Sequence, residues 1–255
     1  MSSDSKPLVL LIHSGGFTSR QWRKLAETLA PSFDVLTPDL LGYGRSGAWP
    51  DGEPFHFRQD LELLETLLRD VETPVHVGGH SYGGFLALQL ALQRPELVRS
   101  IAVYEPVAFG ILDEVADADA RAGLATVRRE WLPDASRTDE AWLSAFVEWW
   151  NGAGAWQRLP EETRAAFRGV GWKLFQEVMT LGVDATDEAA YARITVPTLV
   201  MGGTLSPLTE RRVVEKLGAA LPNASARFFD GVGHMAPVSH AAMVNAAMAE
   251  FFAQS

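Results

Sequence analysis

Six short apolar runs separated by amphipathic segments constrain the fold of this 255-residue chain more than any other feature. The runs cover residues 8–13, 33–38, 74–79, 98–105, 197–203 and 225–231. Helical patterns lie between or after them, at 19–30, 58–71, 84–93, 209–220 and 239–253. Strands that alternate with helices form parallel sheets covered on both faces. We therefore predict an α/β fold with helices on both faces of a mostly parallel sheet of about six strands.

The alternation lapses between the fourth and fifth runs. There, residues 107–192 form amphipathic segments rich in Trp, Ala and Glu. We expect residues 1–106 and 193–255 to form the core, and residues 107–192 to form a helical lid inserted after the fourth strand. Ligand sites of parallel sheets lie at the carboxyl ends of the strands, so an insertion that leaves from such an end would cover the site.

The segment "GGHSYGG", residues 78–84, joins the third apolar run to a helical pattern. It contains the spacing Gly-x-Ser-x-Gly around Ser81. Small residues beside the serine permit a very tight turn, and the backbone N–H after the serine then points into the site. We predict that Ser81 is a nucleophile. An ordinary serine in a glycine-rich turn is the alternative.

A serine nucleophile needs a base whose pKa is near ambient pH, which favours histidine. Of the six histidines, His234 alone lies on a glycine-flanked loop after the last apolar run, and we predict that it is the base rather than a structural residue. We interpret His80 as a packing residue and His13 as a partner of backbone groups. No His or carboxylate spacing suggests a metal site, and we expect no cofactor.

Four landmarks together resemble the α/β-hydrolase superfamily over nearly the whole chain. They are "LLIHSGGFTSRQW" (10–22), "PDLLGYGRSG" (38–47), "GGHSYGG" and "DGVGHM" (230–235). The resemblance implies a serine hydrolase whose oxyanion hole is formed by the backbone N–H groups of Tyr82 and Gly15. Because Ser14 replaces the usual glycine of the first landmark, Gly16 and Phe17 remain alternatives to Gly15.

The acid that would orient the histidine is missing from the expected segment "GGTLSP", where Ser206 stands in its place. Glu105 ends the fourth apolar run directly before the insertion. Some superfamily members, including a group of haloalkane dehalogenases, take their acid from this strand end, and we predict that Glu105 has this role. Asp230, Asp113, Asp184, or no acid at all, remain open.

Six of the eight tryptophans lie within residues 107–192. Some must form the core of the lid, and the others would line an apolar or aromatic acyl pocket. We expect substrate contacts from Trp131, Trp149 and Trp150, together with Gly16 and Phe17. The same segment has 15 acidic and 8 basic residues, a net charge of −7, which disfavours phosphorylated or CoA-bearing substrates.

A serine rather than an aspartate at position 81 argues against dehalogenase or epoxide hydrolase chemistry, which in this fold uses a carboxylate nucleophile. The predicted function is hydrolysis of a carboxylic ester, lactone or activated acyl bond of a small, largely apolar substrate through a Ser81 acyl-enzyme. A C–C bond hydrolase or lyase that uses the same triad is one alternative. A non-catalytic ligand-binding protein of the same fold is another.

The net charge of −10, without a run of Lys or Arg, favours a small-molecule substrate over nucleic acid or an anionic membrane. The chain has no cysteine, no signal-peptide pattern, and no apolar stretch near the ~18 residues of a membrane span. We therefore expect a cytoplasmic protein that is a monomer or a homodimer.

Overall fold

One parallel sheet forms the centre of the molecule. The computed structural model describes residues 6–131 and 140–255, without the side chains of residues 125–131. The strands are β1 (Leu8–Ile12), β2 (Asp34–Leu36), β3 (Val75–His80), β4 (Val98–Tyr104), β5 (Thr198–Gly203) and β6 (Ala224–Phe229). Their order is β2-β1-β3-β4-β5-β6, and every neighbouring pair is parallel. The predicted α/β fold with a six-stranded sheet is confirmed.

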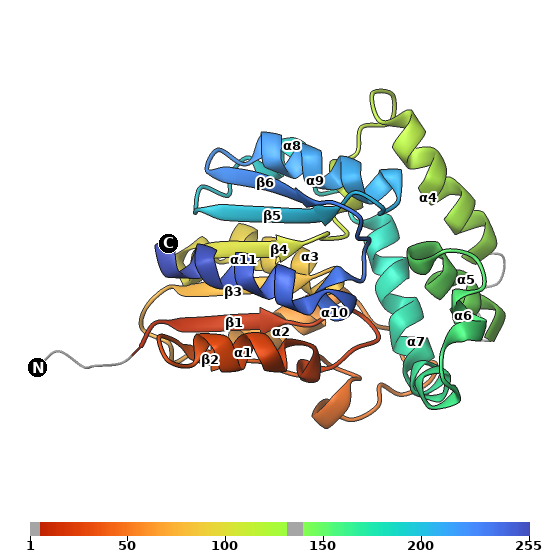
Figure 1. Cartoon of the computed structure of the whole chain (residues 1–255), viewed down its shortest axis with the longest axis horizontal. Coiled ribbons are helices and arrows are strands. Elements are labelled where there is room, and N and C mark those ends of the chain that lie inside the picture. The colour runs from red at the N-terminus through yellow and green to blue at the C-terminus, as the bar shows by residue number, and fades with distance from the viewer. Residues whose placement is uncertain (1–5, 132–139) are drawn as a thin grey trace, which may run out of the picture.

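Helices cover both faces of this sheet (Figure 1). One face carries α1 (Arg23–Leu29) and α11 (Ala241–Gln254), and the other carries α2 (Phe57–Leu67), α3 (Tyr82–Gln93) and α9 (Leu208–Ala220). The short α10 (Ala236–Ser239) precedes α11. The 3-10 helices are η1 (Ser19–Trp22), η2 (Gly44–Ser46), η3 (Pro95–Leu97) and η4 (Phe109–Ile111).

Strand β1 shows why the sheet is apolar on both sides. Val9 and Leu11 join the core under α1 and α11, while Leu10 and Ile12 join the core under α2, α3 and α9. All four side chains are fully buried. Successive side chains of a strand point to opposite faces, so a strand between two helical layers needs apolar residues at every position. This requirement explains the continuous apolar runs in the sequence.

The segment between β4 and β5 folds into helices, as the sequence predicted. They are α4 (Ala118–Trp131), α5 (Glu140–Asn151), α6 (Ala155–Arg158), α7 (Glu161–Val183) and α8 (Glu188–Tyr191). Figure 1 shows α4 to α7 together at the end of the sheet toward which the strands point. Helices α5 to α7 have a core of their own, built around Trp142, Trp156 and Phe175. Helix α8 instead packs on α3 and α9.

A buried ion cluster joins α7 to the sheet domain. Lys173 of α7 lies 3.0 Å from the Asp60 carboxylate of α2 and 2.6 Å from that of Glu177. Tyr82, the residue after the nucleophile candidate, donates its hydroxyl to Asp60 at 2.9 Å. Burial raises the pKa of Glu177 to about 7. Removing one member would leave an uncompensated buried charge, so the cluster fixes where α7 lies on the core.

Within residues 6–131 and 140–255, no helix combines the length and the apolar character that crossing a bilayer requires.

Candidate active site

The turn between β3 and α3 presents Ser81 at the carboxyl end of the sheet. Ser81 has φ 54° and ψ −120°, a conformation that side-chain-bearing residues rarely adopt. A Cβ on Gly79 would lie 2.3 Å from the Gly83 carbonyl oxygen, and a Cβ on Gly83 would lie 2.3 Å from that of Ile12. Both glycines are therefore required by close backbone approach, which is the physical basis of the sequence spacing.

Three buried side chains form one hydrogen-bonded chain at this turn. His234 Nε2 lies 3.0 Å from Ser81 Oγ, and His234 Nδ1 lies 2.8 Å from Glu105 Oε2. Their exposed fractions are 7% for Ser81, 2% for His234 and 0% for Glu105. The structure thus brings together the three residues that the sequence analysis selected from three different segments. Such an arrangement can move a proton from the serine hydroxyl to the imidazole while the carboxylate holds the ring.

Glu105 is held in place by more than His234. Its Oε1 accepts hydrogen bonds from the Gly203 backbone N–H at 2.7 Å and from Ser206 Oγ at 2.5 Å. Its φ of 42° is in the left-handed region, which a Glu rarely adopts. Strain of this kind persists only where the surroundings fix it, and it concentrates at functional sites. Ser206 stands where the acid is expected from the sequence. Its hydroxyl instead donates a hydrogen bond to the Glu105 carboxylate.

The other candidate acids have different partners. Asp230 is exposed and accepts from Thr204 at 3.0 Å. Asp113 accepts from backbone groups of its own turn, and Asp184 accepts from Thr186 at 2.9 Å. The His234 Nδ1 contact with a carboxylate is made by Glu105.

The predicted oxyanion donors lie beside Ser81. Tyr82 is the first residue of α3, so its backbone N–H has no acceptor within the helix. Gly15 and Tyr82 both line the same cavity as Ser81. Phe17 donates its backbone N–H to the Ser14 carbonyl at 3.2 Å and is thereby already engaged in a turn. This turn favours Gly15 over Phe17 as the second donor.

A polar network that was not predicted from the sequence connects the loop that contains Gly15 to the loop that contains His234. His80 Nε2 lies 2.9 Å from the His234 carbonyl oxygen, and its Nδ1 lies 3.0 Å from Gln21 Nε2. Gln21 in turn accepts from the Ser14 backbone N–H at 3.0 Å. Complete burial, followed by the proximity of His234, holds the pKa of His80 well below its usual range. His80 is thus a neutral bridge between the loop of Gly15 and the loop of His234. No spacing in the sequence signals this contact.

His13 is a partner of backbone groups, as predicted from the sequence. Its Nδ1 lies 2.8 Å from the Ser14 carbonyl, and its Nε2 accepts the Leu40 N–H at 3.0 Å. Protonation of Nε2 would remove the acceptor of the Leu40 N–H and break this hydrogen bond. Burial, the largest cause, lowers the pKa of His13 from 6.5 to about 4.

Stability should therefore fall in mild acid. Between pH 6.5 and about 4 the unfolded chain binds a proton at His13 that the folded chain does not, so the free energy of unfolding decreases as pH falls. The expected slope is roughly 1.4 kcal/mol per pH unit for one such group. Urea unfolding of the parent and His13→Asn across this range measures it. The variant should lose part of the slope, whereas His240→Gln, at an exposed imidazole, should keep it. Equal slopes in parent and His13→Asn would contradict the assignment.

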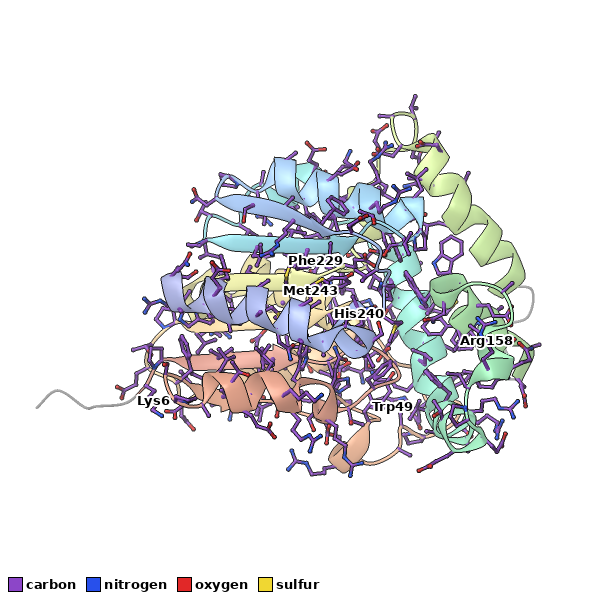
Figure 2. The ribbon with its side chains drawn as sticks, viewed as in Figure 1. Lys6, Trp49, Arg158, Phe229, His240 and Met243 are labelled. Carbon is purple, nitrogen blue, oxygen red and sulfur yellow. The ribbon has the colours of Figure 1, made fainter. Side chains whose placement is uncertain are left out.

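A cavity of about 800 Å³ opens from Ser81 and His234 toward the helices of the insertion. Apolar side chains from the insertion form most of its wall, among them Phe146, Val147, Trp149, Trp150, Phe167, Leu174, Val178 and Met179. Its charged residues include Glu177, and Arg158 of α6, which Figure 2 labels. A cavity of this size and lining fits a small, largely apolar molecule.

The predicted substrate contacts divide into three groups. Phe17, Trp149 and Trp150 line the cavity. Gly16 is not among the residues that line the cavity, and a Cβ there would lie 2.7 Å from the Phe167 ring. Trp131 ends α4, but its side chain falls outside the described part of the structure.

Comparisons with known proteins identify the family. The model described as "Alpha/beta hydrolase family" matches residues 9–247, nearly the whole chain. This chain belongs to the alpha/beta hydrolase family. The resemblance inferred from four short landmarks, and the prediction of an enzyme of the hydrolase class, are confirmed.

Relatives of the chain include esterases and lipases. A pimeloyl-[acyl-carrier protein] methyl ester esterase from Yersinia pseudotuberculosis is 28% identical over 244 residues, 91% of this chain and 88% of the esterase. Lipase LipV from Mycobacterium tuberculosis is 38% identical over 99 residues, 38% of this chain and 36% of the lipase. A hydrolase structure from Pseudomonas aeruginosa PA01 superposes with a TM-score of 0.73 at 26% identity, covering 97% of this chain and 90% of that one.

Clusters of potential metal ligands are absent from residues 6–131 and 140–255. No group of three or more His, Asp or Glu side chains there could hold an ion.

Proposed function

We propose that this chain is a serine esterase that hydrolyses small, largely apolar carboxylic esters through a Ser81 acyl-enzyme. The observation that carries the proposal is the hydrogen-bonded chain from Glu105 through His234 to Ser81, which ends in an apolar cavity. The esterase and lipase relatives support the same chemistry.

Acylation begins when Ser81 Oγ attacks the ester carbonyl carbon and His234 Nε2 takes the hydroxyl proton. Negative charge then develops on the carbonyl oxygen, toward which the backbone N–H groups of Tyr82 and Gly15 are directed in this proposal. Collapse of the tetrahedral intermediate breaks the bond to the alcohol oxygen, which receives the proton from His234. The alcohol leaves, and the acyl group stays on Ser81 as an ester.

Deacylation repeats these steps with water as the nucleophile. His234 takes a proton from the water, hydroxide adds to the acyl carbon, and the proton returns to Ser81 Oγ as the acid leaves. Glu105 keeps Nδ1 protonated and stabilises the imidazolium in both halves of the cycle. Residues 107–192 act as a lid, because their side chains form most of the cavity wall above the triad. The lid confines the acyl group in an apolar space.

Turnover of p-nitrophenyl butyrate, with release of p-nitrophenol in a burst before the steady state, tests this function. A non-catalytic protein of this fold would give neither phase. Ester and C–C cleavage use the same triad, so the products of a mixed screen of short esters and 1,3-diketones must be identified. Turnover of diketones without turnover of esters would contradict the proposal.

Thioesters whose leaving group carries phosphate should be poor substrates. The lid has 15 acidic and 8 basic residues, which repel an anion at the entrance. We expect kcat/KM for the butyryl thioester of N-acetylcysteamine, which has an alkyl thiol leaving group like that of CoA but no phosphate, to exceed that for butyryl-CoA by at least about tenfold at low salt. Added salt should narrow the gap through faster CoA turnover. A preference for butyryl-CoA at low salt would overturn the charge argument.

A further inference from the structure

An aromatic ring of the lid lies directly against the imidazole of the candidate base. The Trp150 indole stacks on His234 with ring centroids 3.8 Å apart and ring planes 19° apart. Trp150 belongs to α5 in the lid, whereas His234 follows β6 in the sheet domain. The contact therefore joins the β4 to β5 connection, which contains α5, to the loop after β6. From the sequence alone, Trp150 is predicted only to contact substrate.

The stack completes the surroundings of the imidazole. Both ring nitrogens of His234 are used in the plane of the ring, by Glu105 at the end of β4 and by Ser81 at the elbow. The His80 ring approaches from β3 at 4.9 Å with an interplanar angle of 47°. From α5 the imidazole meets the face of Trp150. The titratable groups around it are thus Glu105 and His80, and the lid contributes an aromatic face.

That face interacts differently with the two protonation states of His234. During each half-reaction the imidazole becomes a cation, and the π-face of an indole attracts cations more strongly than other aromatic rings do. For a neutral imidazole this attraction is absent. An interaction that strengthens only as the transition state forms lowers the barrier without tightening substrate binding.

We propose that Trp150 is a positioning residue for the general base, so that the lid supplies part of the triad's environment as well as the acyl pocket. The aromatic face orients the imidazole and stabilises the imidazolium. This inference rests on the proposed function. Full activity of the base is thereby coupled to the position of α5, since movement of this helix away from the sheet removes the stack.

Two substitutions separate this role from pocket lining. Trp150→Leu keeps an apolar side chain but removes the π-face, and Trp150→Phe keeps a smaller face. We expect kcat for p-nitrophenyl butyrate to fall about 10- to 30-fold in Trp150→Leu and less in Trp150→Phe, with KM changed by less than about threefold. A residue that only lines the pocket would change KM and leave kcat near the parent value.

Trp172→Phe is the matched control. Trp172 is a lid tryptophan on α7 whose Nε1 donates to the Glu53 carbonyl at 2.9 Å, away from the cavity lining. Its substitution should leave kcat unchanged. Equal kcat values in the parent, Trp150→Phe and Trp150→Leu would overturn the proposal.

A second measurement requires no catalysis. An imidazolium in contact with an indole quenches its fluorescence, so the parent minus Trp150→Phe difference spectrum should show a pH-dependent step. The step should vanish when the same difference is taken in a His234→Ala background. Persistence of the step there would mean that another group, such as His80, titrates, and would overturn the proposal. Because this readout is independent of turnover, a chain without esterase activity that still shows the step would refute the proposed function while the stack stands.

Discussion

Replacing Ser81 with alanine should reduce kcat for ester hydrolysis by about 10⁶-fold, as loss of the serine nucleophile does in subtilisin. A serine-directed phosphonate should label the parent at Ser81 and leave Ser81→Ala unlabelled. The reason is geometric: His234 Nε2 lies 3.0 Å from Ser81 Oγ, so this hydroxyl is the one that the base can deprotonate. Mass spectrometry of the labelled peptide and steady-state kinetics measure the two effects.

The fold should survive this change. Ser81 adopts its left-handed conformation because the adjoining glycines permit the close approach of three backbone segments, and alanine has the same Cβ as serine. Ser239→Ala serves as the control, since Ser239 is an exposed serine on α10, close to His234 in the chain, that bonds to the Met235 carbonyl. It should keep both labelling and rate. Ester turnover by Ser81→Ala at the parent rate would refute the proposed nucleophile.

The fold was predictable because burial on both faces makes each strand apolar throughout. The run at residues 98–105 corresponds to β4, Val98–Tyr104, and the run at 197–203 corresponds to β5, Thr198–Gly203. The elbow was predictable for a related reason. Gly79 and Gly83 have backbone atoms where a Cβ would be, so the fold itself imposes the spacing that identified Ser81. Local chemistry of this kind is visible in a sequence.

Contacts made across the fold were not predictable in the same way. The stack of Trp150 on His234 depends on where α5 lies above the sheet, which no periodicity of α5 encodes. The Gln21 to His80 contact joins residues 59 positions apart. Glu105 could be selected from its place at a strand end. The two donors that hold it are Gly203 at the end of β5 and Ser206 in the loop after β5, and only the three-dimensional structure shows these contacts.

Glu105→Gln should reduce kcat by roughly 10⁴-fold, the loss seen when a serine-protease triad acid becomes an amide. The amide keeps the shape of the side chain but cannot hold Nδ1 protonated or stabilise the imidazolium. Ser206→Ala should have a much smaller effect, because the Gly203 N–H still donates to Glu105 Oε1 at 2.7 Å. Steady-state kinetics on folded protein, checked by circular dichroism, measures both. Near-parent activity in Glu105→Gln would exclude Glu105 as the acid.

The acid should also be movable to position 206. Ser206 Oγ lies 2.5 Å from Glu105 Oε1, so its side chain already points at the space that the carboxylate fills. Glu105→Gly empties that space and suits the φ of 42° at this position, and Ser206→Asp then brings a carboxylate toward His234 Nδ1.

We expect kcat of the Glu105→Gly, Ser206→Asp double variant to be at least about tenfold higher than that of Glu105→Gly alone. This gain is a small part of the roughly 10⁴-fold contribution of a triad acid. Ser206→Asp by itself should lower both rate and melting temperature, because it places a second carboxylate against buried Glu105. A folded double variant no more active than Glu105→Gly would show that position 206 does not reach the imidazole. The triad acid of this chain would then have to come from position 105, directly after β4.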